Sequence, residues 1–190
     1  LGTAIVPAFT RGPACMAQSV GSLAQAAPGR VAFGIGTSSN VIVEGWNGIP
    51  FDQPYQRTRD MLRFLRAALS GEKVTEQYET FSVRSFKLGV VPEQPVPLLV
   101  AGLRPGMLRL AGSEGDGAII NWLSADDVAT AVQLACLLEA GAPKPGNVSP
   151  GRPFHDTSYE DFVASAAAIG PAFRAAGSQP LGATILAAVE

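Results

Sequence analysis

Short apolar segments alternate with amphipathic segments over most of the chain. Four short runs are apolar at most positions, namely Leu1 to Val6, Val31 to Gly36, Val96 to Ala101 and Ala118 to Trp122. Strands of a parallel sheet have this pattern, because both faces of each strand pack against apolar neighbours. The four runs are therefore predicted to be buried parallel strands.

Apolar residues at helical spacing lie between these runs. The first helix is expected to begin near Pro13, to place Met16, Val20, Leu23 and Ala24 on one face, and to stop at Pro28-Gly29. A second is predicted over Gln56 to Leu69, a third over Met107 to Gly112, and a fourth from Ser124 to about Ala140. In the second helix, charged residues interleave with the apolar face, namely Arg57, Arg59, Asp60, Arg63 and Arg66. We interpret the arginines among them as the solvated side of the helix.

A predicted strand followed by a predicted helix occurs four times along the chain. This alternation predicts a parallel α/β sheet, either open or closed into a barrel. Residues 74–89 interrupt it with an excursion of β character. A Pro/Gly-rich linker over residues 141–151 leads to weak helical segments. We therefore expect an α/β domain over residues 1–150 and a helical tail over residues 151–190.

Composition narrows the class of protein. The 190 residues carry a formal net charge of −2 and no Lys/Arg-rich block, which argues against a nucleic-acid partner. No apolar run is long enough to span a bilayer, so no membrane partner is expected. The chain opens inside an apolar run without Met or a basic segment, and Pro7 follows at once. This predicts a chain that begins within a domain and has no signal peptide.

Titratable side chains point to no catalytic centre or metal site. Cys15 and Cys136 are too few and too far apart for a disulfide framework or zinc site, and we expect both to be buried, in a cytoplasmic protein. The sole histidine, His155, has no partner Ser, Cys or Asp at a suggestive spacing. Catalytic residues stay unassigned, and no metal is expected.

Four loops follow the predicted strands, and in parallel α/β folds the site lies in such loops. Small and hydroxyl residues, which let a ligand approach the backbone, occupy Gly34 to Ser39. Gly102 to Gly106 leads into a helix and contains Arg104, a combination that favours an anion. Ile5 to Pro13 and Asn121-Trp122 complete the set. Each loop could equally be a structural turn, and the nucleotide fingerprint of a doubly wound enzyme is missing.

Three collinear stretches together resemble luciferase-like monooxygenases, most closely the branch that uses the deazaflavin coenzyme F420. They are LGTAIVPAFTRGPACMAQSVGSLAQAAPGRVAFGIGTSS, VEGWNGIPFDQPYQRTRDMLRFLRAALSGE and VPLLVAGLRPGMLRLAGSEGDGAIINW. The resemblance implies a parallel (β/α) barrel of the TIM type, of which strands three to six are recognisable. The flanking strands find no match, and the family's frequent His is Gly12 here.

The resemblance also implies roles for residues in these loops. A non-prolyl cis peptide in this family backs the flavin or deazaflavin ring, and its counterpart is the bond between Ala4 and Ile5, beside Val6. The cofactor tail is expected at Gly36, Thr37 and Ser38. The phosphate is expected at Gly102, Leu103, Arg104 and Gly106, with Asn121 near this end of the pocket.

The implied activity is hydride transfer or monooxygenation of a small organic substrate with F420 or FMN. A barrel of four strands leaves edges that need cover, which a homodimer would supply. The alternatives are a truncated, non-catalytic cofactor-binding or structural remnant of the family, and an unrelated doubly wound phosphate-binding enzyme.

Overall fold

A computed structural model describes residues 1–121 of the chain. The chain divides into a compact unit over Leu1–Ala101 and a second unit that starts at Gly102, and each is described by itself.

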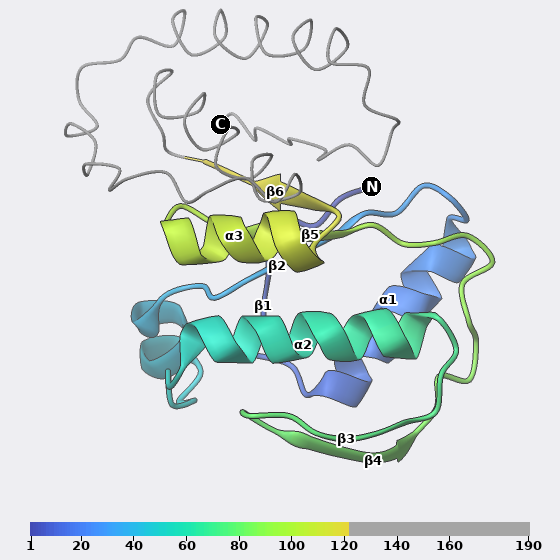
Figure 1. Ribbon diagram of the computed structural model, residues 1–190, viewed down its shortest axis with the longest axis horizontal. Helices are drawn as coiled ribbons and strands as arrows, with labels where there is room; N and C mark the ends of the chain where they lie inside the picture. The colour runs from blue at the N-terminus through green and yellow to red at the C-terminus, as the bar shows by residue number, and fades with distance from the viewer. Residues whose placement is uncertain (122–190) are drawn as a thin grey trace, which may run out of the picture. The chain divides into compact units, whose positions relative to one another are not determined.

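The first unit is built on parallel strands β1 (Val6–Pro7), β2 (Phe33–Gly36) and β5 (Leu98–Ala101). β2 lies between the other two, with Val6 opposite Ile35 on one side and Ile35 opposite Val100 on the other (Figure 1). All four residues of β2 are buried, as the apolar run predicted. The expected parallel α/β arrangement is confirmed.

The first strand differs from its predicted bounds of Leu1 to Val6. Regular pairing covers only Val6 and Pro7, because the residues before them join β2 in another way. Gly2 forms an isolated bridge with Ala32, and the Thr3 hydroxyl both accepts from Gly34 N and donates to Gly34 O, at 2.8 and 2.9 Å. A side chain thus replaces part of the backbone ladder at the start of the strand.

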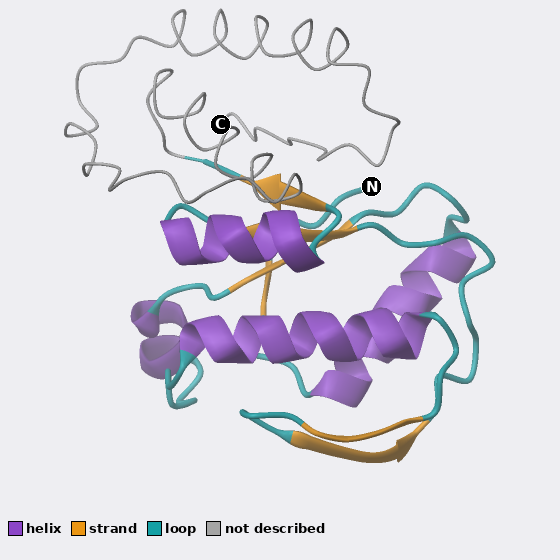
Figure 2. Cartoon of the chain, in the orientation of Figure 1, coloured by secondary structure: helices purple, strands orange, loops and turns teal. Residues whose placement is uncertain are grey.

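Helices α1 (Pro13–Ala26) and α2 (Pro54–Leu69) pack against each other (Figures 1 and 2). Each begins at a proline, whose fixed φ suits the first helical turn. Met16, Val20 and Ala24 form the buried stripe of α1, whereas Leu23, which we expected on that face, is exposed. Cys15 is exposed too, against our expectation. It is the neighbour of Met16 in the sequence, and consecutive residues of a helix do not share a face. The predicted positions of both helices along the chain are confirmed.

An antiparallel hairpin of β3 (Val74–Gln77) and β4 (Ser82–Phe86) forms the excursion of β character (Figure 2). It is anchored on α2 by aromatic rings around the fully buried Phe64. The ring of Phe64 meets those of Tyr78 and Phe81 edge-on, with centroids 6.4 and 6.2 Å apart, and tilts against that of Phe86 at 5.4 Å. Such geometries are favoured by the quadrupole of aromatic rings.

The second unit begins with a loop, helix α3 (Pro105–Glu114) and strand β6 (Gly117–Ile119). Leu108, Leu110 and Ala111 are the buried residues of α3. We expected Asn121 at the end of the last strand. Strand β6 ends at Ile119, so Asn121 lies beyond it. The predicted helix from Ser124, Cys136, His155 and the predicted tail over residues 151–190 lie outside the described residues.

Candidate functional site

The carboxyl ends of the strands in the first unit come together at a glycine. An ideal Cβ placed on Gly36, the last residue of β2, would lie 3.0 Å from Ala101 Cβ and 3.2 Å from Ile5 Cδ1. These separations are shorter than ordinary carbon contacts. Residues from β1's entry, β2 and β5 therefore converge only because position 36 lacks a side chain.

The peptide bond between Ala4 and Ile5 is cis, as the family resemblance implied. Ala4 is exposed, and Ile5 and Val6 are half-buried. The three residues predicted to back a cofactor ring therefore keep surface that a ligand could touch. Their role toward a cofactor stays a prediction.

The loop after β2 carries the predicted tail-binding residues Thr37 and Ser38. Ser38 has a φ of 64°, in the left-handed region that non-glycine residues seldom occupy. The Thr37 hydroxyl donates to the Ser38 carbonyl at 3.2 Å, and both side chains are half-buried. Two hydroxyl groups thus stand next to the converging strand ends.

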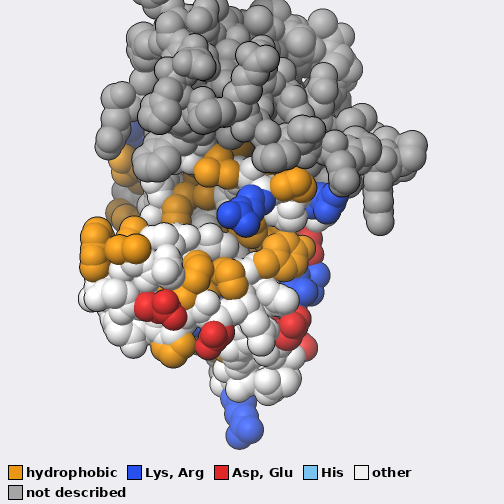
Figure 3. Space-filling model, turned by 90° about the vertical axis from the view of Figure 1, so that its left-hand side faces the viewer, with side chains coloured by type: hydrophobic (Ala, Val, Ile, Leu, Met, Phe, Trp, Pro, Cys, Tyr) orange, Lys and Arg blue, Asp and Glu red, His pale blue; other side chains and the backbone are white. Residues whose placement is uncertain are grey.

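A π-helix that the sequence reading did not anticipate follows this loop. The helix, η1 (Val41–Trp46), buries Val43 but leaves Trp46 75% and Val41 56% exposed. Tyr55, at the start of α2, is 37% exposed as well. Figure 3 shows hydrophobic side chains at several places on the face of the molecule that it draws. No helical periodicity in VIVEGW signals this element, since a π-helix repeats differently and is usually short.

The loop after β1 is held by α2. Ala8 N donates to Gly36 O at 2.9 Å, so the loop stays paired with the end of β2. Arg57 Nε donates to Ala8 O at 3.2 Å, and its guanidinium lies 4.8 Å from the ring centroid of Phe81 and 5.9 Å from that of Phe9. Burial lowers the pKa of Arg57, while the carboxylate of Asp60 partly offsets this effect. Arg57 remains a cation at any ordinary pH.

Asp60 is the only charged side chain among the buried residues that the structure describes. Its Oδ1 accepts from Arg59 Nη2 at 2.8 Å and Nε at 3.1 Å, and its Oδ2 accepts from Thr80 N at 2.9 Å and Oγ1 at 3.0 Å. Burial raises the pKa of Asp60, but these hydrogen bonds outweigh burial and hold the pKa below its usual value. Asp60 thereby fixes the segment that joins β3 to β4 onto α2.

The prediction that the arginines of α2 form its solvated side was wrong for Arg57, and the burial of Asp60 was not anticipated. The spacing of the helix contained the signal. Arg57 lies four residues before the buried Met61, and Asp60 lies four residues before the buried Phe64. Residues four apart share a face, so both polar groups lie on buried rows and need partners there.

The second unit holds the predicted phosphate loop at the amino end of α3. Gly102 is buried, and a Cβ there would lie 2.9 Å from Met107 Cβ and 3.0 Å from Met107 C. Leu103 and Arg104 are exposed, and Arg104 stands in extended conformation at the residue before the helix. No acidic residue occupies the first turn. Unpaired amides and an exposed guanidinium make this turn suitable for an anion.

The remaining predicted residues of this unit are Gly106 and Asn121. Gly106 is the second residue of α3 and is half-buried. Asn121 is exposed beyond β6.

Within residues 1–121, none of the helices combines the length and apolar character that a membrane span requires.

Comparison with known proteins identifies the fold class as the parallel (β/α) barrel of the TIM type. The family model of luciferase-like monooxygenases matches residues 1–151, and the chain belongs to that family. A second family model, that of ATP:dephospho-CoA triphosphoribosyl transferase, matches residues 125–190, which lie outside the described part of the chain.

Two curated relatives illustrate the similarity. A 5,10-methylenetetrahydromethanopterin reductase of Methanolobus tindarius is 33% identical over 146 residues, which are 77% of this chain and 43% of the relative. An F420-dependent glucose-6-phosphate dehydrogenase of Gordonia bronchialis is 34% identical over 124 residues, 63% of this chain and 37% of the relative. The chain therefore spans about two fifths of the length of these relatives.

Solved structures share the fold. The coenzyme F420-dependent tetrahydromethanopterin reductase of Methanopyrus kandleri superimposes with a TM-score of 0.66 at 22% identity, over 75% of this chain and 46% of the other. The oxygenating constituent of 3,6-diketocamphane monooxygenase from Pseudomonas putida, in complex with FMN, gives 0.60 at 17% identity, over 76% and 45%. The expected family and fold are confirmed.

Proposed function

We propose that the chain is an oxidoreductase of the luciferase-like family that binds coenzyme F420 and serves hydride transfer to or from a small organic substrate. The observation that carries the proposal is the convergence of Ile5, Gly36 and Ala101, which brings three strand ends to one point without side-chain bulk. A curated relative named for F420 is 34% identical to this chain over 124 residues. FMN, the ligand of the diketocamphane enzyme, is the other candidate cofactor.

Each predicted contact has a defined task in this proposal. The Ala4–Ile5 peptide and Val6 would support one face of the tricyclic ring. Gly36, with no side chain, and the hydroxyls of Thr37 and Ser38 would contact the cofactor tail. When bound, the cofactor supplies the two-electron chemistry, and the protein supplies position and electrostatics.

In the second unit, the proposed task is to hold the cofactor phosphate. Gly102 packs closely on the first turn of α3, where a Cβ would lie 2.9 Å from Met107 Cβ, and Gly106 lies within that turn. Leu103 flanks the turn, and the Arg104 side chain is exposed. Amide donors at a helix start and a bidentate guanidinium match phosphate oxygens. We assign Asn121 to this end of the site on the family resemblance.

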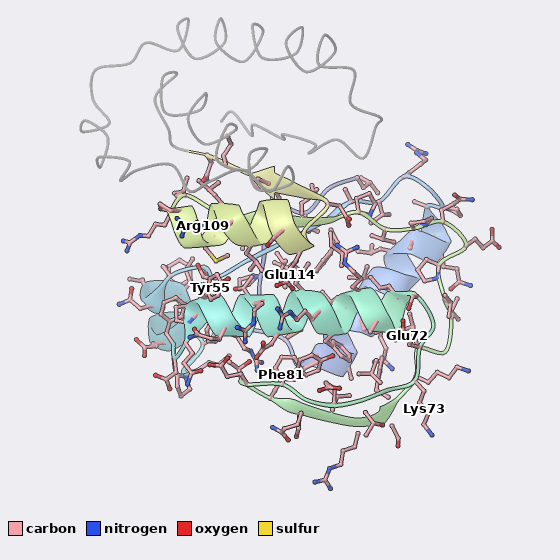
Figure 4. All side chains as sticks on the ribbon, in the orientation of Figure 1. Tyr55, Glu72, Lys73, Phe81, Arg109 and Glu114 are labelled. Atoms are coloured by element: carbon pink, nitrogen blue, oxygen red, sulfur yellow. The ribbon has the colours of Figure 1, made fainter. Side chains whose placement is uncertain are left out.

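Arg104→Ala tests the phosphate assignment. Because a hydrogen bond to a charged group contributes about 1.5–3 kcal/mol, we expect F420 to bind roughly 10- to 100-fold more weakly and with a shallower salt dependence. Arg109, an exposed arginine on the same helix, provides the matched control Arg109→Ala (Figure 4). Equal weakening in both variants would contradict the assignment, because it would reflect the general charge of α3.

A non-catalytic, cofactor-binding role is the second candidate. It is favoured by the candidate site itself, in which each assigned residue has a task toward the cofactor and none is assigned to a substrate or a catalytic step. This role predicts cofactor binding without turnover. Oxidation or reduction of bound F420 that depends on an added substrate, such as a secondary alcohol, would exclude it.

A further inference from the structure

Arg57 joins segments that are distant in the sequence. Its Nε donates to Ala8 O in the loop after β1 at 3.2 Å, and its Nη1 donates to Thr80 O in the hairpin at 3.4 Å. The guanidinium also lies over the rings of Phe9 and Phe81. Phe81 stands between the hairpin and α2 (Figure 4). Only a planar group with several donors can satisfy both carbonyls and stack on a ring.

Ala8, the residue whose carbonyl Arg57 holds, is paired through its N–H with the proposed site. Ala8 N donates to Gly36 O, and Gly36 is the residue at which the strand ends converge. Phe9 is buried, with its ring centroid 5.0 Å from that of Phe51. The backbone at Ala8 is thus fixed from one side by the end of β2 and from the other by α2.

The hairpin end of this connection is rigid as well. Asp60 accepts hydrogen bonds from both the N–H and the hydroxyl of Thr80, so the Thr80 carbonyl that meets Arg57 has a fixed place. A continuous path of hydrogen bonds therefore runs from Asp60 through Thr80 and Arg57 to Ala8 and Gly36.

We propose that Arg57 is a positioning residue that locks the loop after β1 against the end of β2, and so holds the surface on which the cofactor ring would rest. The proposal rests on the proposed function for its consequence in binding. Arg57 is assigned no contact with a ligand, and it acts through the two carbonyl oxygens that accept from its Nε and Nη1. Its effect passes through the Ala8 peptide.

The test compares three variants of the 190-residue chain. Arg57→Met keeps an apolar stem but removes the donors. Arg57→Lys restores the charge, and its ammonium group donates without the planar fork that serves both carbonyls. Phe86→Leu weakens the packing of the hairpin on Phe64 without touching Arg57 or its partners. The Phe86→Leu variant shows how far a loss of stability alone changes the hydrogen exchange and the affinity for F420.

The site-specific readout is amide hydrogen exchange at Ala8, divided by that at Met16, whose N–H bonds to Gly12 O in the neighbouring turn. In Arg57→Met we expect the ratio to rise about tenfold and F420 to bind about tenfold more weakly, the effect of one hydrogen bond to a charged group. Arg57→Lys should fall between Arg57→Met and wild type. Phe86→Leu should change neither quantity by more than about twofold, because substitutions that share no contact have nearly independent effects.

Two results overturn the proposal. An unchanged exchange ratio in Arg57→Met shows that Arg57 does not hold the loop. A raised ratio with unchanged affinity for F420 shows that the held loop does not support the cofactor. If the wild-type chain binds neither F420 nor FMN, the proposed function fails, and the locking of the loop stands or falls on the exchange ratio alone.

Discussion

Replacement of Asp60 by asparagine tests the anchoring of the hairpin on α2. The Asp60 side chain is 2% exposed and accepts two hydrogen bonds on each carboxylate oxygen, from Arg59 and from Thr80. An amide keeps one acceptor oxygen, and its NH2 group would face the donors of Arg59 or of Thr80. At least two bonds are therefore lost, and the ion pair with Arg59 disappears.

The expected loss follows from those contacts. Two hydrogen bonds to a charged group, less the compensation by water at the partly exposed Arg59, give a loss of about 2–4 kcal/mol in the free energy of unfolding. Urea denaturation followed by circular dichroism measures it. Glu79→Gln is the control: Glu79 is the other partner of Arg59, but its side chain is 50% exposed, so about 0–1 kcal/mol is expected. A loss for Asp60→Asn within about 0.5 kcal/mol of wild type, the range of surface substitutions, would refute the reasoning.

Further outcomes follow from the same structure. The pKa of Asp60 in the folded chain lies below its unfolded value of about 3.9. Its stabilising contribution is therefore present above that pH and is lost as the pH falls through the lower folded pKa. Denaturation midpoints measured from pH 6 to pH 2 should accordingly depend less on pH in Asp60→Asn than in the wild type. Gly102→Ala should cost about 1–3 kcal/mol in thermal unfolding and weaken F420 binding, since its Cβ meets Met107, whereas Gly89→Ala opens into free space and should cost little. Gly36→Ala should likewise weaken F420 binding, because its Cβ would press on Ala101; unchanged affinity would remove position 36 from the site.

Sequence patterns predicted the strands that are buried on both faces and the helices that begin at a proline. The runs around Phe33 to Gly36 and Leu98 to Ala101 are apolar because both faces are covered, and prolines mark the starts of α1 and α2. The strand-end loops could be located for the same reason. The cis bond at Ala4–Ile5 was predictable only from the family resemblance, since nothing in the local composition requires it.

Contacts between distant segments were beyond the sequence pattern. The interleaved arginines of α2 were interpreted as a solvated face, although Arg57 meets a carbonyl of the loop after β1, 49 residues away. Asp60 likewise meets donors of Thr80, 20 residues away. Their place on the buried rows of the helix was visible, but their partners became apparent only once the loop after β1 and the hairpin were placed. The π-helix at Val41–Trp46 lacked a periodic signal altogether.

The central claim is that this chain binds a deazaflavin or flavin cofactor. Titration of the purified 190-residue chain with F420 and, separately, with FMN, followed by fluorescence quenching, tests it most directly. We predict saturable binding of F420, tighter than that of FMN and weakened by Arg104→Ala. Absence of saturable binding of either cofactor, in a preparation that shows a cooperative unfolding transition, would contradict the account.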